Sequence, residues 1–255
     1  MYIRLNKYIL NTLTTIKETK MKKIIVTIAF LALSTISAKA IDFSNFEVTA
    51  GIAHNEGVFG ATARERNENQ SGVVVSDKKE SGVFTEGYSS YLIELGIGQY
   101  VSLGYEHTPD SVSTPSNTSR VGNAAGTNTV SVDFNDLNTT YVKLNLPIFE
   151  NFYAKYGLVS TDLDIRESMG SASTYSNVST DGTTMGLGYD RQIKETGFGF
   201  RFETSYLELD NVTTNNGVAA GTVSATNAAS RNQVDASNLE GLTAKVALTY
   251  TFGRN

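Results

Sequence analysis

The last stretch of the chain, Leu242 to Phe252, alternates apolar and polar residues with a period of two. That period is typical of a β-strand, because successive side chains point to opposite faces of a sheet. The apolar face ends in two aromatic residues, Tyr250 and Phe252. Aromatic side chains at a strand end suit the interface between a membrane and water. The pattern therefore predicts a strand with one face toward lipid.

The same alternation recurs earlier in the chain, so the sequence predicts eight strands in all. The connections between them are alternately short and long, with long polar loops expected at 55–87, in the stretch that contains Pro109 and Pro115, around 170–180 and at 210–238. In the fourth strand the parity of Val142 continues back to Val130, so this strand is expected to project beyond a bilayer. The predicted strands are Phe43 to His54, Tyr88 to Ile97, Tyr100 to His107, a strand ending at Leu146, Phe152 to Ser160, Thr183 to Arg191, Gly197 to Leu209 and Leu242 to Phe252.

Long connections at one end and short turns at the other are characteristic of transmembrane β-barrels. After residue 40 no apolar run reaches the length of a membrane-spanning helix. Lipid tolerates strands only in a closed sheet, because open edges would leave backbone groups without partners. The faces opposite the apolar ones carry most of the strand charges, so we place the apolar faces outward. The expected fold class is all-β: an eight-stranded antiparallel up-and-down transmembrane β-barrel.

The start of the chain has the pattern of an export signal. Met21 is followed by two lysines and a short apolar core, and Ala38 and Ala40 form a small-x-small cleavage site. The residues before Met21 are best explained by a start site assigned too early, and a long basic n-region is the alternative. The expected organisation is an upstream extension at 1–20, a cleaved signal peptide at 21–40 and a barrel domain at 41–255.

Charge and cysteine content exclude several classes of protein. Seven of the 21 Lys and Arg residues and one of the 26 acidic residues lie in residues 1–40, which leaves the rest of the chain with a net charge of −11. Such an acidic chain is a poor nucleic-acid binder, because nothing would offset phosphate repulsion. There is no cysteine, so disulfides and thiolate metal sites are excluded. No metal or other cofactor is expected.

Charged residues on the inward faces predict an ionic network in the barrel interior. An eight-stranded barrel is just wide enough to be filled by side chains, and a buried charge is costly unless it is paired. Structural packing is the main interpretation of this network, and a narrow gated ion path is the alternative. It is expected in the half nearest the short turns. Its predicted members are Glu47, Glu94, Glu106, Lys143, Lys155, Asp190, Arg201, Glu203 and Lys245.

Three further groups of residues could carry function. His54 and His107 are expected at the membrane interface, where anchoring competes with a catalytic role. The segment from Asp133 to Asn138 superficially resembles a calcium loop but lacks its glycine and distal glutamate, so a solvated loop is expected. Aromatic residues are expected to form interfacial girdles, with Tyr141 pointing inward by parity. The girdle candidates are Tyr88, Tyr91, Tyr105, Tyr141, Tyr156, Tyr189, Phe198, Tyr206, Tyr250 and Phe252.

The signal peptide and the end of the last strand resemble the small outer-membrane barrels of the OmpA and OmpX type and the related surface antigens. Lys245, Ala247, Tyr250 and Phe252 are similar to the C-terminal assembly signal of such barrels, although Ala247 stands where glycine is usual and residues 253–255 follow the last aromatic. The resemblance implies a bacterial outer-membrane location with both termini in the periplasm. It also implies contact with outer-membrane lipid and lipopolysaccharide, and recognition of the last strand by the barrel assembly machinery.

The expected function is that of a non-enzymatic outer-membrane barrel with a packed lumen and long surface loops, serving envelope integrity or contact with an unknown extracellular partner. One alternative is a narrow porin for small or hydrophobic solutes, of the OmpW kind. Another is a lipid A-modifying enzyme, since the resemblance includes barrels of that activity. Conductance would favour the pore, and altered lipid A would favour the enzyme.

Overall fold

The structure is a computed structural model that describes residues 46–69, 71–120, 127–168, 174–194, 196–218 and 231–252. The expected upstream extension, the signal peptide and its cleavage site at Ala38 and Ala40 lie outside the described residues. Nothing in the part of the chain that is described is a helix long and apolar enough to cross a membrane. The strands are β1 (Phe46–Glu68), β2 (Val74–Ile97), β3 (Val101–Thr108), β4 (Val112–Ser113), β5 (Asn117–Arg120), β6 (Thr127–Asn145), β7 (Phe152–Ser168), β8 (Val178–Gln192), β9 (Phe198–Leu209), β10 (Val212–Asn215) and β11 (Asn232–Phe252).

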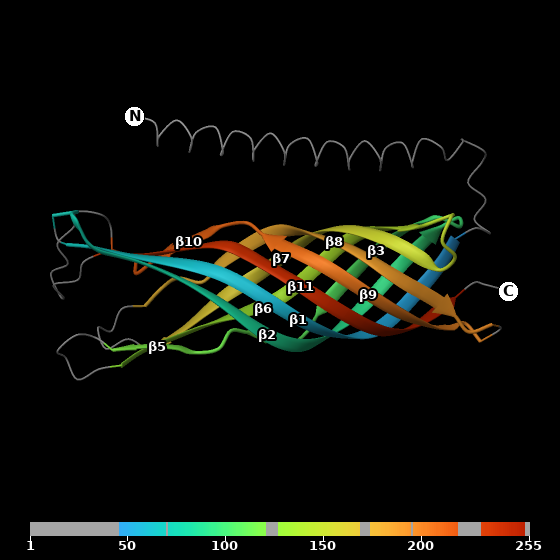
Figure 1. Ribbon diagram of the computed structural model, residues 1–255, viewed down its shortest axis with the longest axis horizontal. Helices are drawn as coiled ribbons and strands as arrows, with labels where there is room; N and C mark the ends of the chain where they lie inside the picture. The colour runs from blue at the N-terminus through green and yellow to red at the C-terminus, as the bar shows by residue number, and fades with distance from the viewer. Residues whose placement is uncertain are drawn as a thin grey trace, which may run out of the picture. The chain divides into compact units, whose positions relative to one another are not determined.

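Eight of these strands form a closed antiparallel ring (Figure 1). Each strand pairs with its neighbour in the order β1, β2, β3, β6, β7, β8, β9, β11, and β11 pairs with β1 to close the barrel. The closing register runs from Val48 opposite Phe252 to Asn67 opposite Asn232. The short strands β4 and β5 pair with β6, and β10 pairs with β11. The prediction of an eight-stranded up-and-down barrel is confirmed.

The two ends of the barrel differ in their connections. At one end, the turn end, short segments join β2 to β3, β6 to β7 and β8 to β9. Gly98 and Asn151 adopt positive φ angles of 65° and 66° in two of these turns. Such angles favour glycine and asparagine, which explains these residues at the tight turns. At the other end, the loop end, the β1–β2 connection is also short, and the remaining connections are longer or contain the short strands.

Several strands extend farther toward the loop end than the sequence predicted. β1 and β2 pair as far as Glu68 opposite Val74, so most of the expected loop at 55–87 is a long hairpin. The loops expected around 170–180 and at 210–238 are also partly strand, because β8 enters the first and β10 and β11 enter the second. Apolar alternation marks only strand segments in lipid. Beyond lipid, backbone pairing and charged pairs hold the strands, so that signal is absent.

A β-bulge in β6 corrects a second expectation. The register with β7 shifts between Asn135 and Asn138, and Asp136 has a positive φ of 48°. A bulge adds one residue and exchanges the two faces of the strand. Phe134 therefore packs against the interior cluster that includes Val159, although it shares sequence parity with the outward Val142. The segment from Asp133 to Asn138 is thus strand and bulge rather than the expected solvated loop.

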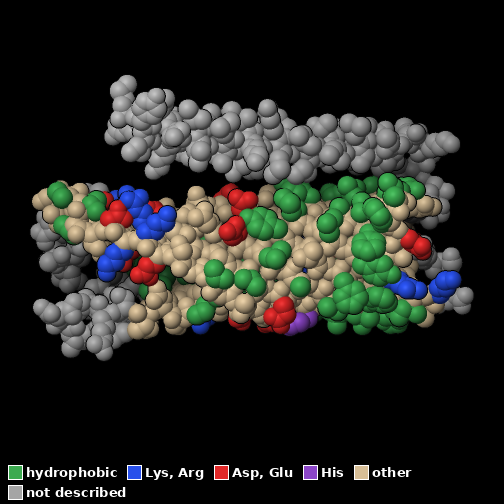
Figure 2. All heavy atoms as spheres, in the orientation of Figure 1, with side chains coloured by type: hydrophobic (Ala, Val, Ile, Leu, Met, Phe, Trp, Pro, Cys, Tyr) green, Lys and Arg blue, Asp and Glu red, His purple; other side chains and the backbone are tan. Residues whose placement is uncertain are grey.

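The outer surface near the turn end is hydrophobic (Figure 2). Ile52, Leu158 and Leu248 expose 56%, 63% and 51% of their surface, whereas the charged Glu94 and Arg201 are buried at 2% and 1%. Apolar side chains outside and ionic ones inside are the reverse of a soluble barrel and match a transmembrane one. The outward placement of the apolar faces therefore holds in the structure.

Candidate functional site

A compact ionic layer lies inside the barrel toward the turn end. Arg201 of β9 donates two hydrogen bonds to the Glu94 carboxylate of β2, at 2.7 and 2.8 Å, and its Nη2 lies 2.7 Å from Asp190 of β8. Lys143 of β6 joins the same acids, with its Nζ 2.7 Å from Glu94 and 3.0 Å from Asp190. We call these four residues the turn-side layer. Two cations face two carboxylates, so the layer is neutral.

A second ionic layer lies beside the first. Lys245 Nζ is 2.5 Å from Glu106 and 3.3 Å from Glu203. Lys155 pairs with Glu203 and lies 3.7 Å from Glu106. Ser90 donates a 2.6 Å hydrogen bond to Glu106. We call Glu106, Lys155, Glu203 and Lys245 the loop-side layer; it is also neutral.

Two tyrosines join the layers reciprocally. Tyr141 donates its hydroxyl to Glu94 of the turn-side layer at 2.8 Å, while its ring lies 5.0 Å from the ammonium of Lys155 in the loop-side layer. Tyr153 donates to Glu203 of the loop-side layer at 2.6 Å, and its ring lies 5.3 Å from the guanidinium of Arg201. Each tyrosine therefore makes a hydrogen bond in one layer and a cation–π contact in the other. The layers form one connected unit.

Glycines opposite the tyrosines make room for their rings. Gly104 pairs with Tyr141 across strands β3 and β6, and a Cβ added at Gly104 would lie 2.3 Å from the ring. Gly188 pairs with Tyr153 across strands β8 and β7, and an added Cβ would lie 2.2 Å from that ring. Both distances are far inside van der Waals contact. Each ring therefore lies flat across its glycine, which sets the direction of its hydroxyl.

The composition of the two layers favours a structural role. Burying a charge without a partner is expensive, and buried ion pairs are tolerated when the remaining lone pairs are also satisfied. Glu94 accepts hydrogen bonds from Arg201, Lys143 and Tyr141. Glu203 accepts them from Tyr153 and Ser205 in addition to the lysines. Among these buried carboxylates no side-chain oxygen lacks a partner, so the network is saturated.

The turn end opens into a polar vestibule of about 1220 Å³. Lys143 and Asp190 line its inner limit, so the turn-side layer forms its floor. Glu47, which the sequence assigned to the ionic network, lines this vestibule. It lies one residue from the start of β1, where the strand has not yet reached the level of the buried charges.

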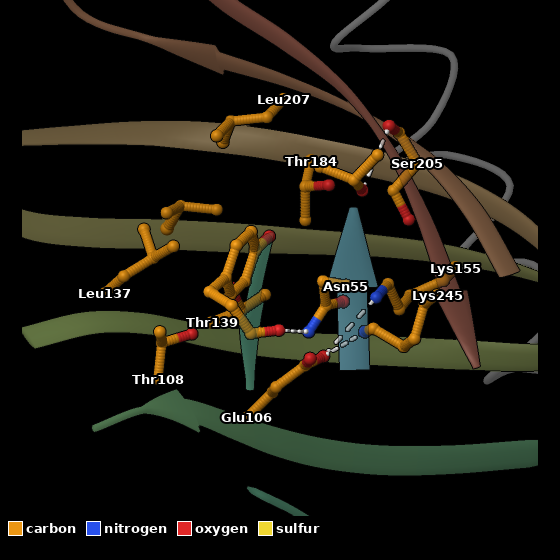
Figure 3. Close-up of a pocket in the computed structure, with 13 residues that line it drawn as sticks. Asn55, Glu106, Thr108, Leu137, Thr139, Lys155, Thr184, Ser205, Leu207 and Lys245 are labelled. Carbon is orange, nitrogen blue, oxygen red and sulfur yellow. Dashed lines mark hydrogen bonds and ion pairs between the residues drawn. The ribbon is translucent and has the colours of Figure 1, made fainter. Parts of the chain in front are cut away.

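A small polar cavity lies on the other side of the loop-side layer (Figure 3). Its volume is about 40 Å³, which holds water-sized occupants but no organic ligand. Asn55, Glu106 and Lys245 point toward it in the close-up. Tyr88 also lines this cavity, so it faces the lumen rather than a lipid interface, and its assignment to an aromatic girdle was wrong.

Hydrophobic side chains fill the lumen beyond the cavity. Val159, Leu209 and Leu239 form a buried cluster, and Phe134 and Leu137 pack against it. We call this cluster the apolar layer. The phenyl ring of Phe59 adds to the filling: it stacks on Phe84 with centroids 5.3 Å apart and covers Gly57 and Gly241. The lumen is therefore closed in series by two ionic layers and one apolar layer.

The other predicted site residues lie elsewhere. His54 is exposed on the outer surface and lies 3.1 Å from Glu56, and His107 lies 2.8 Å from the side-chain oxygen of Asn138. Neither contact includes a hydroxyl nucleophile. Asp133 is buried and paired with Arg166, and no group of three or more metal-binding side chains occurs among the described residues.

The C-terminal residues divide between the two faces of β11. Lys245 and Ala247 face inward, where Ala247 packs with Ala53 and Leu92. Tyr250 and Phe252 face outward with their rings 4.7 Å apart. The aromatic pair is therefore presented on the outer surface of the strand that closes the barrel.

Comparison with solved structures identifies the architecture. The outer membrane protein OprG from Pseudomonas aeruginosa superposes with a TM-score of 0.54 at 10% identity, covering 80% of this chain and 95% of OprG. The fold is that of an outer-membrane β-barrel. More distant likenesses are to AlkL, with a TM-score of 0.39, 10% identity and coverage of 84% and 94%, and to the protease OmpT from Escherichia coli, with 0.40, 13% and coverage of 85% and 100%. No protein-family model and no curated protein matches the sequence.

Two parts of this interior were missed in the sequence. Tyr153 has inward parity and could have been added to the network by its position two residues from Lys155. The apolar layer could not be found by parity, because Phe134 reaches it only through the bulge and Leu137 lies within the bulge itself.

Proposed function

We propose that this chain is a sealed barrel of the bacterial outer membrane whose role is contact at the cell surface. The turn end and both termini face the periplasm, and the loop end faces outward, as in other barrels with short turns and long loops. The signal peptide expected at 21–40 would direct export. The filled lumen supports a structural rather than a transport role, because its eight charged side chains pair with one another.

The observation that carries the proposal is the free edge of β2. β2 pairs with β1 from Val74 to Ile97, but with β3 only from Tyr91 to Ile97. Within the described strands, β2 between residues 74 and 90 is therefore paired with a strand on one side only, although β4 lies near it and Asn117 of β5 donates a side-chain hydrogen bond to Glu80. An edge of this length presents unpaired backbone donors and acceptors, which can bind an extended polypeptide as an added strand.

The β1–β2 hairpin that carries this edge has a charged pair suited to a water-exposed position. Arg64 and Asp77 form a two-pronged ion pair across β1 and β2, with Nε–Oδ1 and Nη2–Oδ2 distances of 2.8 and 2.5 Å. Val75 and Val83 are 62% and 75% exposed on β2. A partner strand would cover these apolar side chains while its backbone pairs with the edge. Main-chain pairing gives affinity and the side chains give specificity.

The strand register supplies a clean test. Thr62 lies opposite Ser81, so removing residues 62–81 and joining Ala61 to Gly82 through an Asn-Gly turn shortens the hairpin without shifting the remaining pairs. A random peptide library is panned against the refolded barrel with the full-length and the shortened hairpin. We expect peptides that bind only the full-length protein and that lose binding when alternate backbone amides are N-methylated.

A matched control removes a similar length elsewhere. Leu163 lies opposite Val178, so replacing residues 164–177 with an Asn-Gly turn shortens the β7–β8 connection in register. The selected peptides should still bind this variant. If the peptides bind the variant with the shortened β1–β2 hairpin equally well, the edge of β2 is not the contact surface.

A narrow pore is the alternative function. The vestibule at the turn end favours it, since it admits solutes to the turn-side layer. A pore would require the two ionic layers and the apolar layer to open together, and single-channel recording on the mature protein tests this directly. We propose no catalytic role, because the contacts of His54 and His107 include no nucleophile. Assembly into the membrane is proposed to use Tyr250 and Phe252 as the signal for the assembly machinery.

A further inference from the structure

Aromatic side chains at the turn end gather on one part of the hydrophobic outer surface (Figure 2). They form an unbroken series of ring contacts from the β6–β7 turn across β7, β8 and β9. The centroid distances are 6.5 Å for Phe149–Phe152, 5.2 Å for Phe152–Tyr189, 6.4 Å for Tyr189–Phe200 and 5.7 Å for Phe200–Phe202. We call these five residues the aromatic face.

Strands β2, β3 and β6 carry aliphatic residues at the same end of the barrel. Leu95 of β2 pairs with Leu103 of β3, and Leu103 pairs with Val142 of β6. Leu95 and Leu103 are exposed on the outer surface. Rings favour the level where a membrane meets water, and an even girdle would place them all around the barrel. The aromatic face instead covers only part of the circumference, so it differs from its surroundings in chemistry as well as in position.

An arginine without a partner lies beside the aromatic face. Arg191 is exposed on β8, pairs with Phe200 of β9 and shares the outward parity of Leu187. It forms no ion pair and no side-chain hydrogen bond with another residue in the described parts of the chain. The adjoining β6–β7 turn holds one acid, Glu150, which is likewise in no ion pair there. Arg191 therefore presents an uncompensated guanidinium at the turn-side margin of the apolar surface.

We propose that Arg191 and the aromatic face bind an anionic phospholipid of the periplasmic leaflet. The guanidinium of Arg191 donates hydrogen bonds to the phosphate of the headgroup. The rings of Tyr189 and Phe200 contact the glycerol backbone and the first methylenes of the chains, which run from the turn end into the membrane. The inference rests on the periplasmic position of the turn end, which is part of the proposed function, and not on the contact role of β2.

Charge and geometry favour this occupant. A planar guanidinium presents paired N–H donors that match phosphate oxygens, and a headgroup with a net negative charge neutralises it. A second copy of the barrel fits less well, because two copies packed through this surface would enclose both Arg191 side chains without an anion.

The outer surface carries the opposite charge nearer the loop end. Glu208 of β9 lies directly opposite Glu240 of β11, and both are exposed. Carboxylates that face each other in this way repel an anionic headgroup. The charges of the outer surface therefore favour an anionic lipid at the turn end and disfavour one at the loop side.

The absence of tryptophan from the chain allows a site-specific test. Phe200→Trp places a single tryptophan beside Arg191, and Leu103→Trp places one on the aliphatic side, each two residues from the turn-end start of its strand. Each variant is reconstituted in phosphatidylcholine vesicles with increasing amounts of phosphatidylglycerol brominated on its chains. We expect half-maximal quenching of the Phe200→Trp variant at a several-fold lower mole fraction of brominated lipid than for the Leu103→Trp variant. Brominated phosphatidylcholine should reach half-maximal quenching at the same mole fraction for both.

Two charge variants in the Phe200→Trp background test the role of the guanidinium. Arg191→Gln is expected to remove the excess quenching by phosphatidylglycerol and to leave the phosphatidylcholine curve unchanged. Lys194→Gln removes the same charge in the β8–β9 turn, where Lys194 lines the vestibule, and should leave most of the excess.

Several results would overturn the proposal. Identical phosphatidylglycerol curves for the two tryptophan positions would remove the site, and an equal loss of excess in Arg191→Gln and Lys194→Gln would remove the assignment to Arg191. The same excess with brominated phosphatidylcholine would contradict the choice of an anionic headgroup. Weaker quenching of Phe200→Trp than of Leu103→Trp by both lipids would show that a second copy covers this surface instead.

Discussion

The guanidinium of Arg201 donates two hydrogen bonds, of 2.7 and 2.8 Å, to the carboxylate of Glu94 across the barrel interior. The two residues are 107 positions apart in sequence and belong to strands that are not neighbours in the sheet. The pair therefore ties opposite parts of the wall together through the lumen. Bidentate Arg–carboxylate geometry is the strongest form of this contact.

Removing the charge of Glu94 should destabilise the barrel strongly. In Glu94→Gln, Arg201 and Lys143 would share only Asp190, which leaves one buried positive charge without compensation. Removing one partner of a buried ion pair typically lowers the free energy of unfolding by ~3–5 kcal/mol. Urea unfolding of the protein folded in lipid vesicles measures the loss. Adding Lys143→Met restores neutrality, so the double variant should be more stable than the single one; a Glu94→Gln variant as stable as the parent would contradict the account.

Alanine at Gly188 should disturb both layers without touching a charge. Its Cβ would meet the ring of Tyr153, whose hydroxyl bonds Glu203 and whose ring contacts Arg201. Overpacking of this kind costs ~1–3 kcal/mol. The same unfolding experiment measures it, with Gly82→Ala as the control because nothing lies within 4 Å of an added Cβ there. Equal stability of the two variants would show that the ring is free to move.

The sequence was sufficient for the order of the eight barrel strands and for the direction of most of their faces within the lipid-spanning part. Alternation in lipid is strict, so the parity of residues such as Lys143 and Arg201 specified that they point inward. The interior partners could not be derived, because sequence parity shows which face of a strand a residue lies on but not its level along the barrel axis. Strand tilt brings Glu94 to Arg201, and that tilt depends on the shear of the closed barrel.

The loop-end half was less predictable for a different reason. In water, polar residues suit a loop and a paired strand equally. The loop-end parts of the hairpin, β1 after His54 and β2 before Tyr88, therefore carried no pattern that separates a strand from a loop. The bulge at Asp136 was also invisible, since it inverts the faces without changing the residue alternation. Tyr88 was assigned to a girdle because it is an aromatic residue at the start of the predicted strand, although it shares the inward parity of Ser90 and Glu94.

The ion pair between Arg64 and Asp77 in the projecting β1–β2 hairpin should be detectable as a lowered pKa of Asp77. The hydrogen bond and charge of Arg64 hold the pKa of Asp77 below its ordinary value of 3.8. Because the folded pKa is the lower one, the stabilisation of the hairpin is present above the unfolded pKa and is lost as the pH falls through the folded pKa. Carbon-13 NMR of the Asp77 carboxyl should show the pKa rising in Arg64→Gln and changing less in Arg66→Gln. No change in Arg64→Gln would contradict the pairing.

Replacing Phe252 should reduce assembly into the outer membrane more than it reduces the stability of the folded barrel. Phe252 is 52% exposed on the outer surface, so Phe252→Ala removes few interior contacts and should refold in detergent like the parent. If the aromatic pair is the assembly signal, cells should contain several-fold less folded variant in the outer membrane. Tyr91→Ala, at an outward position with 56% exposure, is the matched control. Equal membrane levels of the two variants would remove the assembly role.

Single-channel recording on the refolded mature protein in a planar bilayer tests most directly whether the lumen is closed. Two ionic layers and the apolar layer lie in the lumen between the vestibule and the loop end, so we expect no continuous water path. We predict a flat baseline at voltages that leave the barrel folded. Stable, reproducible conductance steps from the parent protein would contradict the account and favour the pore.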